Sequence, residues 1–215
     1  MNDIVKKYAD IEDTVFMSVE EAKVLSEELA DRAKQLDIEF DQIVGIANGA
    51  RLMTTIIAER MGLPYQMLTI RRKGSVIKEY LSRFPLLIRF FSFWYSIPVL
   101  KYPLVEAMCR LRGLSDTSDL NSSKSNKSNQ LKNILIVDDA LEFGSTIEAA
   151  KTIMKSNNEN ANIVVAVISW RVLRPNEEQV ATPDIFITRM VQHYPWSMNS
   201  PHFTEYEQWL IDHDA

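Results

Sequence analysis

The sequence contains a single cysteine, Cys109, among 215 residues. One cysteine excludes an internal disulfide framework and a zinc site built from cysteines. The stretch from Met1 to Met17 lacks the apolar core of a secretory signal peptide, so we expect a cytoplasmic protein. An excess of basic residues is also lacking. The formal net charge of -5 argues against a chain that binds nucleic acid along its whole length.

The composition is that of an ordinary globular protein, with 46% apolar and 25% charged residues. A chain of 215 residues is long enough for one α/β domain with an appendage, but short for two full domains. No internal repeat is evident. We therefore expect a single domain over residues 1–215 that carries an insertion at residues 71–132.

Charge is unevenly distributed along the chain. Residues 71–132 hold 12 of the 24 basic residues and only 4 of the 29 acidic ones, which gives this segment a local charge of +8. The rest of the chain is strongly acidic. A basic segment in an acidic body suggests an anionic substrate or an anionic surface as partner.

Short apolar runs alternate with amphipathic helical patterns on both sides of the insertion. A capping box at Ser18–Glu21 begins the first expected helix. The expected strands are 43–47, 65–70, 134–137, 163–170 and 184–187, and the expected helices run from 18 to about 36, 52 to 62 and 145 to about 155. Strands that alternate with helices predict an α/β fold with a mostly parallel five-stranded sheet flanked by helices.

The insertion has two unlike halves. Residues 84–105 are apolar, aromatic and basic, whereas residues 115–130 are polar and rich in serine and asparagine, which predicts a flexible segment. Three interpretations stay open. The insertion is a lid over an active site, an interfacial segment that contacts an anionic membrane surface, or a helical hood or dimer interface. Arginines and prolines interrupt residues 84–105 too often for a membrane span.

The chemistry is concentrated in residues 134–146. An apolar strand delivers Asp138 and Asp139 at the edge of the sheet where ligands bind in α/β proteins. Gly144, Ser145 and Thr146 then open a helix, whose free amides and dipole suit a phosphate group. Carboxylates beside such a cradle suit ribose hydroxyls or a hydrated Mg²⁺. The alternative is an ordinary strand end followed by an ordinary helix cap.

This stretch resembles the signature of the type I phosphoribosyltransferases, although Glu142 stands where the family usually has aspartate and Phe143 where it often has threonine. The resemblance continues in residues 18–49, which are similar to the family's first helix and diphosphate loop. Residues 183–186 and 194–196 are similar to the tail of the hypoxanthine and xanthine-guanine branch. The resemblance does not extend to residues 71–132.

The resemblance implies a role for each matching residue. Glu142, Phe143, Gly144, Ser145 and Thr146 would bind the 5′-phosphate, and Asn48, Gly49, Ala50 and Arg51 would form the diphosphate loop. Asp138 and Asp139 would hold the ribose hydroxyls and orient Mg²⁺, directly or through water. The resemblance implies that Asp138, Asp139 and Glu142 are the catalytic residues. Glu142 would lie near the base and could transfer a proton.

The base pocket departs from the family pattern. Where the purine branch commonly has a lysine that reads the 6-oxo group, the nearest cation here is Arg171. Val191 stands where an aromatic residue often stacks on the base. Trp170, Tyr194 or Trp196 could stack on it instead, although an ordinary role in the core or at the rim is the commoner one for each.

The function that the resemblance implies is transfer of phosphoribose from phosphoribosyl diphosphate to a nucleobase, a 6-oxopurine, with Mg²⁺ as cofactor and diphosphate as product. We also expect a homodimer. The absence of a basic residue at Asn48 motivates one alternative, a non-catalytic protein that senses a nucleotide or phosphoribosyl diphosphate. The apolar and basic residues 84–105 motivate another, a membrane-surface phosphoribosyltransferase with a non-purine acceptor.

Overall fold

The computed structural model describes residues 2–70, 131–173 and 177–213. All of these except Ile70 belong to one compact unit, which comprises Met1–Thr69 and Asn121–Ala215. The expectations for the insertion, namely a lid, a membrane contact, and a hood or dimer interface, lie outside the described residues, as does Cys109. No helix in the described ranges is long and apolar enough to span a bilayer.

Five parallel strands form one sheet in the order β2-β1-β3-β4-β5, as the alternating pattern predicts. The strands are β1 (Gln42–Ile46), β2 (Tyr65–Leu68), β3 (Asn133–Leu141), β4 (Asn162–Trp170) and β5 (Ile185–Thr188). β3 is the central strand, with β1 on one side and β4 on the other. Loops that follow β1, β3 and β4 therefore leave the sheet side by side at its carboxyl edge.

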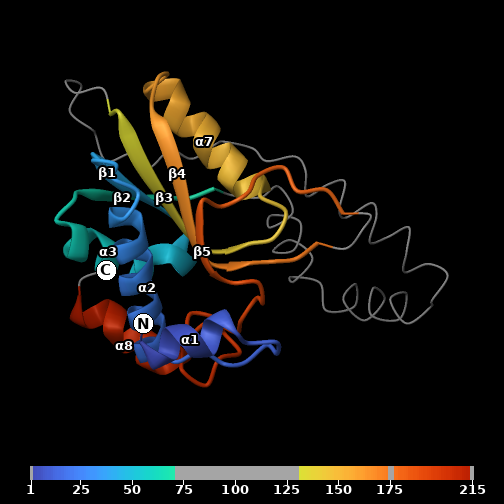
Figure 1. Ribbon diagram of the computed structural model, residues 1–215. Helices are drawn as coiled ribbons and strands as arrows, with labels where there is room; N and C mark the ends of the chain where they lie inside the picture. Colours follow the sequence, from blue (N-terminus) through green and yellow to red (C-terminus); the bar gives the residue numbers. More distant parts are fainter. Residues whose placement is uncertain (1, 71–130, 174–176, 214–215) are drawn as a thin grey trace, which may run out of the picture. The chain divides into compact units, whose positions relative to one another are not determined.

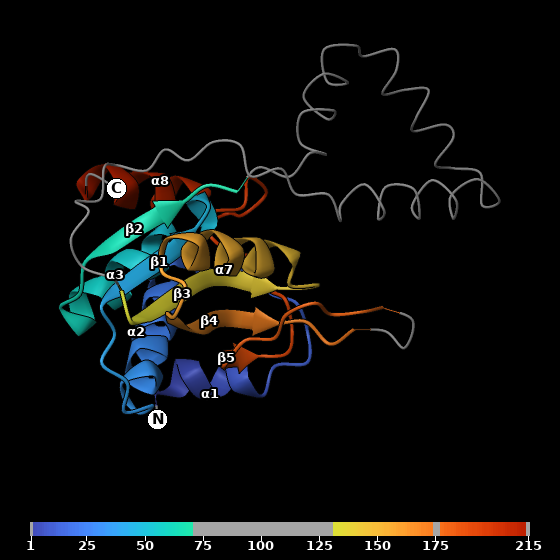
Figure 2. The same cartoon turned by 90° about the horizontal axis from the view of Figure 1, so that it is seen from above.

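Helices cover both faces of this sheet (Figures 1 and 2). The elements are α1 (Asp3–Ala9), α2 (Val19–Lys34), the 3₁₀ turn η1 (Asn48–Ala50), α3 (Arg51–Met61), α7 (Ser145–Asn157) and α8 (Phe203–Asp212). α2 and α3 pack together on one face, and α7 lies on the other. The short helices α1 and α8 have no counterpart in the sequence-based prediction.

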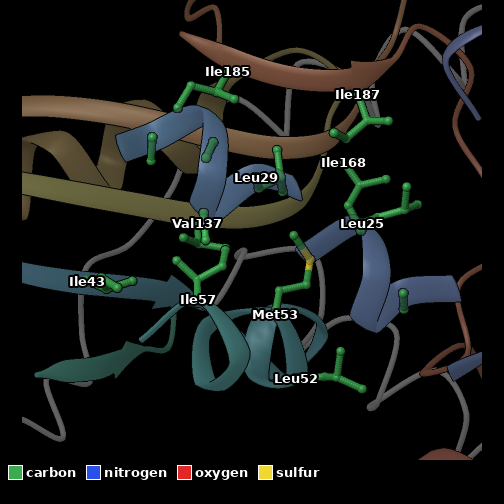
Figure 3. Packing of buried hydrophobic residues seen from close by; sticks show 14 of the residues in the cluster. Leu25, Leu29, Ile43, Leu52, Met53, Ile57, Val137, Ile168, Ile185 and Ile187 are labelled. Atoms are coloured by element: carbon green, nitrogen blue, oxygen red, sulfur yellow. The ribbon is translucent and has the colours of Figure 1, made fainter. Parts of the chain in front are cut away.

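The larger core lies between the sheet and helices α2 and α3 (Figure 3). Val137 of β3 and Ile168 of β4 point into it, among Leu25 of α2 and Met53 and Ile57 of α3. Because side chains alternate along a strand, Ile136 of β3 and Val167 of β4, which are buried as well, belong to the face that α7 covers. Burial on both faces explains the continuous apolar runs of the strands.

The predicted capping box at the start of α2 is confirmed. Ser18 Oγ accepts a hydrogen bond from the Glu21 amide at 3.2 Å, and Glu21 Oε2 accepts one from the Ser18 amide at 2.9 Å. Lys7 Nζ lies 2.6 Å from Glu21 Oε1. Burial raises the pKa of Glu21, but the hydrogen bonds from Lys7 and Ser18 outweigh it, and the net shift is downward.

The expected loop over residues 138–144 is wrong in its first half. β3 continues to Leu141, so both aspartates lie inside the strand rather than after it. The reason is the length of β4, which offers parallel partners that pair Asp138 with Val167 and Leu141 with Trp170. The first expected helix also ends earlier, at Lys34 instead of Leu36.

Candidate functional site

The turn after β1 carries backbone strain. Ala47 has φ of 54°, a left-handed conformation that is unfavourable for a residue with a side chain. Its amide donates to the carbonyl oxygen of Leu68 at 2.9 Å, which anchors the turn to β2. Strain of this kind collects at ligand-binding turns, and here it directly precedes the expected diphosphate loop, Asn48–Arg51.

Gly49 brings this turn against the end of β3. A Cβ added to Gly49 would lie 2.7 Å from Asp139 Oδ2 and 3.1 Å from the indole nitrogen of Trp196. At such distances a methyl group on Gly49 would have to displace the Asp139 carboxylate and the Trp196 indole, so glycine permits the close approach. The structure thus brings together one residue of the expected diphosphate loop and one of the two expected ribose-binding aspartates.

Two other residues of the expected diphosphate loop have different surroundings. Ala50 is fully buried, and Arg51 begins α3. Burial raises the pKa of Tyr206, the charge of Arg51 lowers it and that of Asp139 raises it. Arg51 and Asp139 therefore act in opposite directions on the pKa of the same tyrosine.

Asp138 and Asp139 occupy consecutive positions in a strand and therefore belong to opposite faces of the sheet. Asp139 shares its face with Val137 and lies on the side of α3, whereas Asp138 lies on the side of α7. Asp138 Oδ1 accepts from the Asp139 amide at 3.0 Å, and Asp139 Oδ1 accepts from the Ala140 amide at 2.6 Å. Both side chains are only partly buried.

Asp139 is also held by two aromatic residues of the tail. Trp196 Nε1 donates to Asp139 Oδ2 at 2.6 Å, and the hydroxyl of Tyr194 lies 2.9 Å from the Asp139 carbonyl oxygen. The two rings are stacked, with centroids 5.0 Å apart. The Tyr194 hydroxyl also lies 2.6 Å from Ser169 Oγ. Burial, with the charge of Asp139, raises the pKa of Tyr194 well above its ordinary value.

The loop from β3 to α7 is fixed through its carbonyl groups. The carbonyl oxygens of Leu141, Glu142 and Phe143 accept hydrogen bonds from the Arg171 amide, the Gln179 side chain and the Val180 amide at 2.8–3.0 Å. These acceptors are therefore committed to the segment that follows β4. Repulsion of an anion by these three oxygens is reduced accordingly.

Gly144 then turns the chain into α7. Its φ of 83° is left-handed, and it is the N-cap residue of the helix, so Ser145 is not the cap. As a glycine, Gly144 has no side chain with which to cap the amides at the start of α7. Ser145 and Thr146, both partly buried, form the first turn of this helix.

Arg171, the expected base-reading residue, lies at the end of β4 among acidic side chains. Its guanidinium is 3.3 Å from both carboxylate oxygens of Glu177 and 3.9 Å from Glu142 Oε2. It also lies over the ring of Phe143, 5.4 Å from the centroid. Arg171 and Glu142, which were expected to serve the base, are thus in mutual contact.

The three aromatic residues considered for base stacking all have partners. The guanidinium of Arg189 lies 3.6 Å from the ring centroid of Trp170, and Phe186 meets that ring edge-on at 5.1 Å. Tyr194 and Trp196 stack on each other. Sequence reasoning missed Tyr194 and Trp196 as partners of Asp139. The only indication in the sequence was that both residues lie in the segment 194–196, which is similar to the tail of the hypoxanthine and xanthine-guanine branch.

The carboxylates fit a magnesium ion of the usual hydrated kind. Mg²⁺ keeps several waters and takes one or two carboxylates together with substrate phosphates. Asp138 and Asp139 offer hard oxygen ligands of this type at the sheet edge. Over the described ranges, no group of three or more histidine, cysteine or acidic residues could hold a metal by itself. Asp138 and Asp139 therefore suit an ion whose remaining ligands are water and substrate.

The family and the fold of this chain follow from comparisons with known proteins. The model of the phosphoribosyl transferase domain family matches residues 18–198. The chain is similar in fold to a purine phosphoribosyltransferase from Pyrococcus horikoshii, with a TM-score of 0.53 and 16% identity over 86% of this chain and 94% of that one. No curated protein matches it.

Two further solved structures share the fold. For the xanthine-guanine-hypoxanthine phosphoribosyltransferase of Helicobacter pylori, the TM-score is 0.54 and the identity 12%, over 91% of this chain and 98% of that one. For a hypothetical protein from Neisseria gonorrhoeae with bound ppGpp, the TM-score is 0.56 and the identity 11%, over 92% of this chain and 96% of that one. At such identities the likeness concerns the fold.

Proposed function

This chain belongs to the phosphoribosyl transferase domain family, and from that premise we propose that it transfers phosphoribose from phosphoribosyl diphosphate to a 6-oxopurine base and releases diphosphate. The observation that carries the proposal is the contact of Gly49 with Asp139. It joins the turn after β1 to the end of β3, which are the two elements that have to hold the diphosphate and the ribose of one substrate.

Each part of the substrate has a matching group in the proposal. The amides at the start of α7, with Ser145 and Thr146, bind the 5′-phosphate, because a helix N-terminus favours an anion. Asp138 and Asp139 accept hydrogen bonds from the ribose hydroxyls. The turn at Asn48–Ala50, which follows the strained Ala47, binds the diphosphate through its amides, and Arg51 contributes its charge.

The reaction breaks the bond between C1 of the ribose and the diphosphate oxygen and forms a bond from C1 to a ring nitrogen of the base. Positive charge develops on the sugar ring, as in glycoside hydrolysis, so nearby carboxylates stabilise the transition state. The attacking nitrogen loses a proton, which Glu142 accepts. Arg171 donates to the 6-oxo group of the base.

Asp138 and Asp139 are the residues that we propose to hold Mg²⁺, directly or through water. When bound, the ion neutralises negative charge on the departing diphosphate. The protein keeps the diphosphate oriented through the turn at Gly49.

Isothermal titration with phosphoribosyl diphosphate and Mg²⁺ tests the proposal. We expect binding by the wild type and its loss in the double variant Asp138→Asn, Asp139→Asn. A matched control replaces the exposed Asp3 and Asp10 of the N-terminal helix region by asparagine, which makes the same change of charge away from the sheet edge. Absence of binding by the wild type, or equal binding by both double variants, would overturn the proposal.

One observation favours a second candidate function. Arg171, the cation meant for the base, is already paired with Glu177 and Glu142. An occupied base-reading group suits a protein that retains the ribose-phosphate site but senses a nucleotide without catalysis. Diphosphate release measured across purine and pyrimidine bases distinguishes the two: nucleotide binding without any release favours the sensor.

A further inference from the structure

The indole of Trp196 touches two elements of the proposed site at once. Its nitrogen donates to Asp139 Oδ2 at 2.6 Å and lies 3.1 Å from the position that a Cβ on Gly49 would occupy. Trp196 lies 57 residues beyond Asp139 in the sequence and follows β5. The tail of the chain therefore reaches back to the junction between β1 and β3.

The two carboxylate oxygens of Asp139 accept hydrogen bonds from different donors. Oδ1 accepts from the Ala140 amide and Oδ2 from Trp196. A carboxylate has about four lone-pair sites, so an oxygen bonded to one of these two donors can also accept a hydrogen bond from a sugar hydroxyl. They also fix the rotation of the carboxylate, because each oxygen is tied to a different donor. An ordered acceptor loses less entropy when a ligand binds.

Packing and hydrogen bonding by Trp196 are separable. The ring stacks on Tyr194 at 5.0 Å and meets Tyr206 at 5.8 Å, and those contacts need only an aromatic ring. The bond to Asp139 needs the indole N–H. Core packing alone does not require a donor at this position, and phenylalanine would fill much of the same space.

We propose that Trp196 is a positioning residue for phosphoribosyl transfer, whose indole N–H orients the Asp139 carboxylate beside Gly49 toward the ribose hydroxyls. The inference rests on the proposed function. It assigns Trp196 to the site as a donor to a ligand-binding carboxylate, a role different from that of a ring that stacks on the base.

The test compares Trp196→Phe with a variant in which 3-benzothienylalanine replaces Trp196, keeping the bicyclic shape without the N–H. We expect both to bind phosphoribosyl diphosphate with Mg²⁺ about tenfold more weakly than wild type, the loss expected for one hydrogen bond to a charged group. The matched control Trp209→Phe removes an indole from the same aromatic region of the tail and should bind as wild type does.

Indole N–H resonances provide a readout that a purely structural role would not move. The signal that disappears in Trp196→Phe should shift in Asp139→Asn and again when wild type binds the substrate. If wild type binds but the benzothienyl variant binds equally well, the inference is wrong and the proposed function stands. If wild type binds no phosphoribosyl diphosphate, the proposed function itself fails. An Asp139→Asn spectrum with the Trp196 signal unmoved also contradicts the inference.

Discussion

Gly144 packs directly against the backbone of Ala181: a Cβ on Gly144 would lie 2.7 Å from both the nitrogen and the carbonyl oxygen of Ala181. Backbone atoms have little freedom to move aside. Since φ of Gly144 is also left-handed, this position is doubly restricted to glycine.

We therefore predict that Gly144→Ala lowers the free energy of unfolding by about 3 kcal/mol, the sum of the left-handed penalty and the overpacking. Urea denaturation followed by circular dichroism measures it. Gly62→Ala is the matched control, because Gly62 has a φ of 67° but no atom within 4 Å of its added Cβ. Its loss should be only about 1 kcal/mol. Equal losses in the two variants would show that the contact with Ala181 is unimportant.

Gly49→Ala should affect binding more than stability. Its φ is not left-handed, so the added methyl acts only by displacing the Asp139 carboxylate and the Trp196 indole. We expect the affinity for phosphoribosyl diphosphate with Mg²⁺ to fall at least about tenfold, as measured by isothermal titration. Gly62→Ala again serves as control and should bind normally. Wild-type affinity in Gly49→Ala would contradict the proposed diphosphate loop.

Arg171→Ala should act on the base rather than on the sugar phosphate. Loss of one charged donor predicts a KM for the base about tenfold higher, with the KM for phosphoribosyl diphosphate unchanged. The ion pairs of Arg171 are partly exposed, so stability should change by less than about 1 kcal/mol. Steady-state kinetics measure both constants. A parallel rise in both KM values would instead assign Arg171 to holding the loop at Glu142.

The capping box should make stability depend on acid pH. The pKa of Glu21 is below its ordinary value of 4.5 in the folded chain, so its stabilisation is present above that value and is lost as the pH falls through the folded pKa. We predict that Glu21→Gln flattens the decline of unfolding free energy below about pH 5. Urea denaturation at several pH values measures the decline. Glu20→Gln, at an exposed neighbouring position, should keep the wild-type slope.

The sheet could be predicted because its strands are buried on both faces and appear as short apolar runs. The capping box of α2 could be predicted because its partners lie three residues apart. The extension of β3 to Leu141 could not, since it depends on the length and register of β4. α8 could not be predicted either. Its residue Tyr206 packs against Trp196, which lies outside the helix, so the burial of this tyrosine depends on a contact beyond the helix itself.

The acidic strand end and the glycine turn were visible in the sequence, but their contacts were not. Gly49 and Asp139 are neighbours only because β1 and β3 are adjacent. The bond from Trp196 to Asp139 joins residues 57 positions apart, with no local pattern to signal it. The 6-oxopurine acceptor, Mg²⁺, the homodimer and the cytoplasmic location stay predictions.

The alternation along β3 has a consequence for how a ligand would act on the protein. With Asp138 on the α7 layer and Asp139 on the α3 layer, a sugar that engages both carboxylates straddles the rim of the sheet. Such a ligand ties the two helical layers together across the central strand. Amide hydrogen exchange should consequently slow in α3 and α7 at the same time when the sugar phosphate binds.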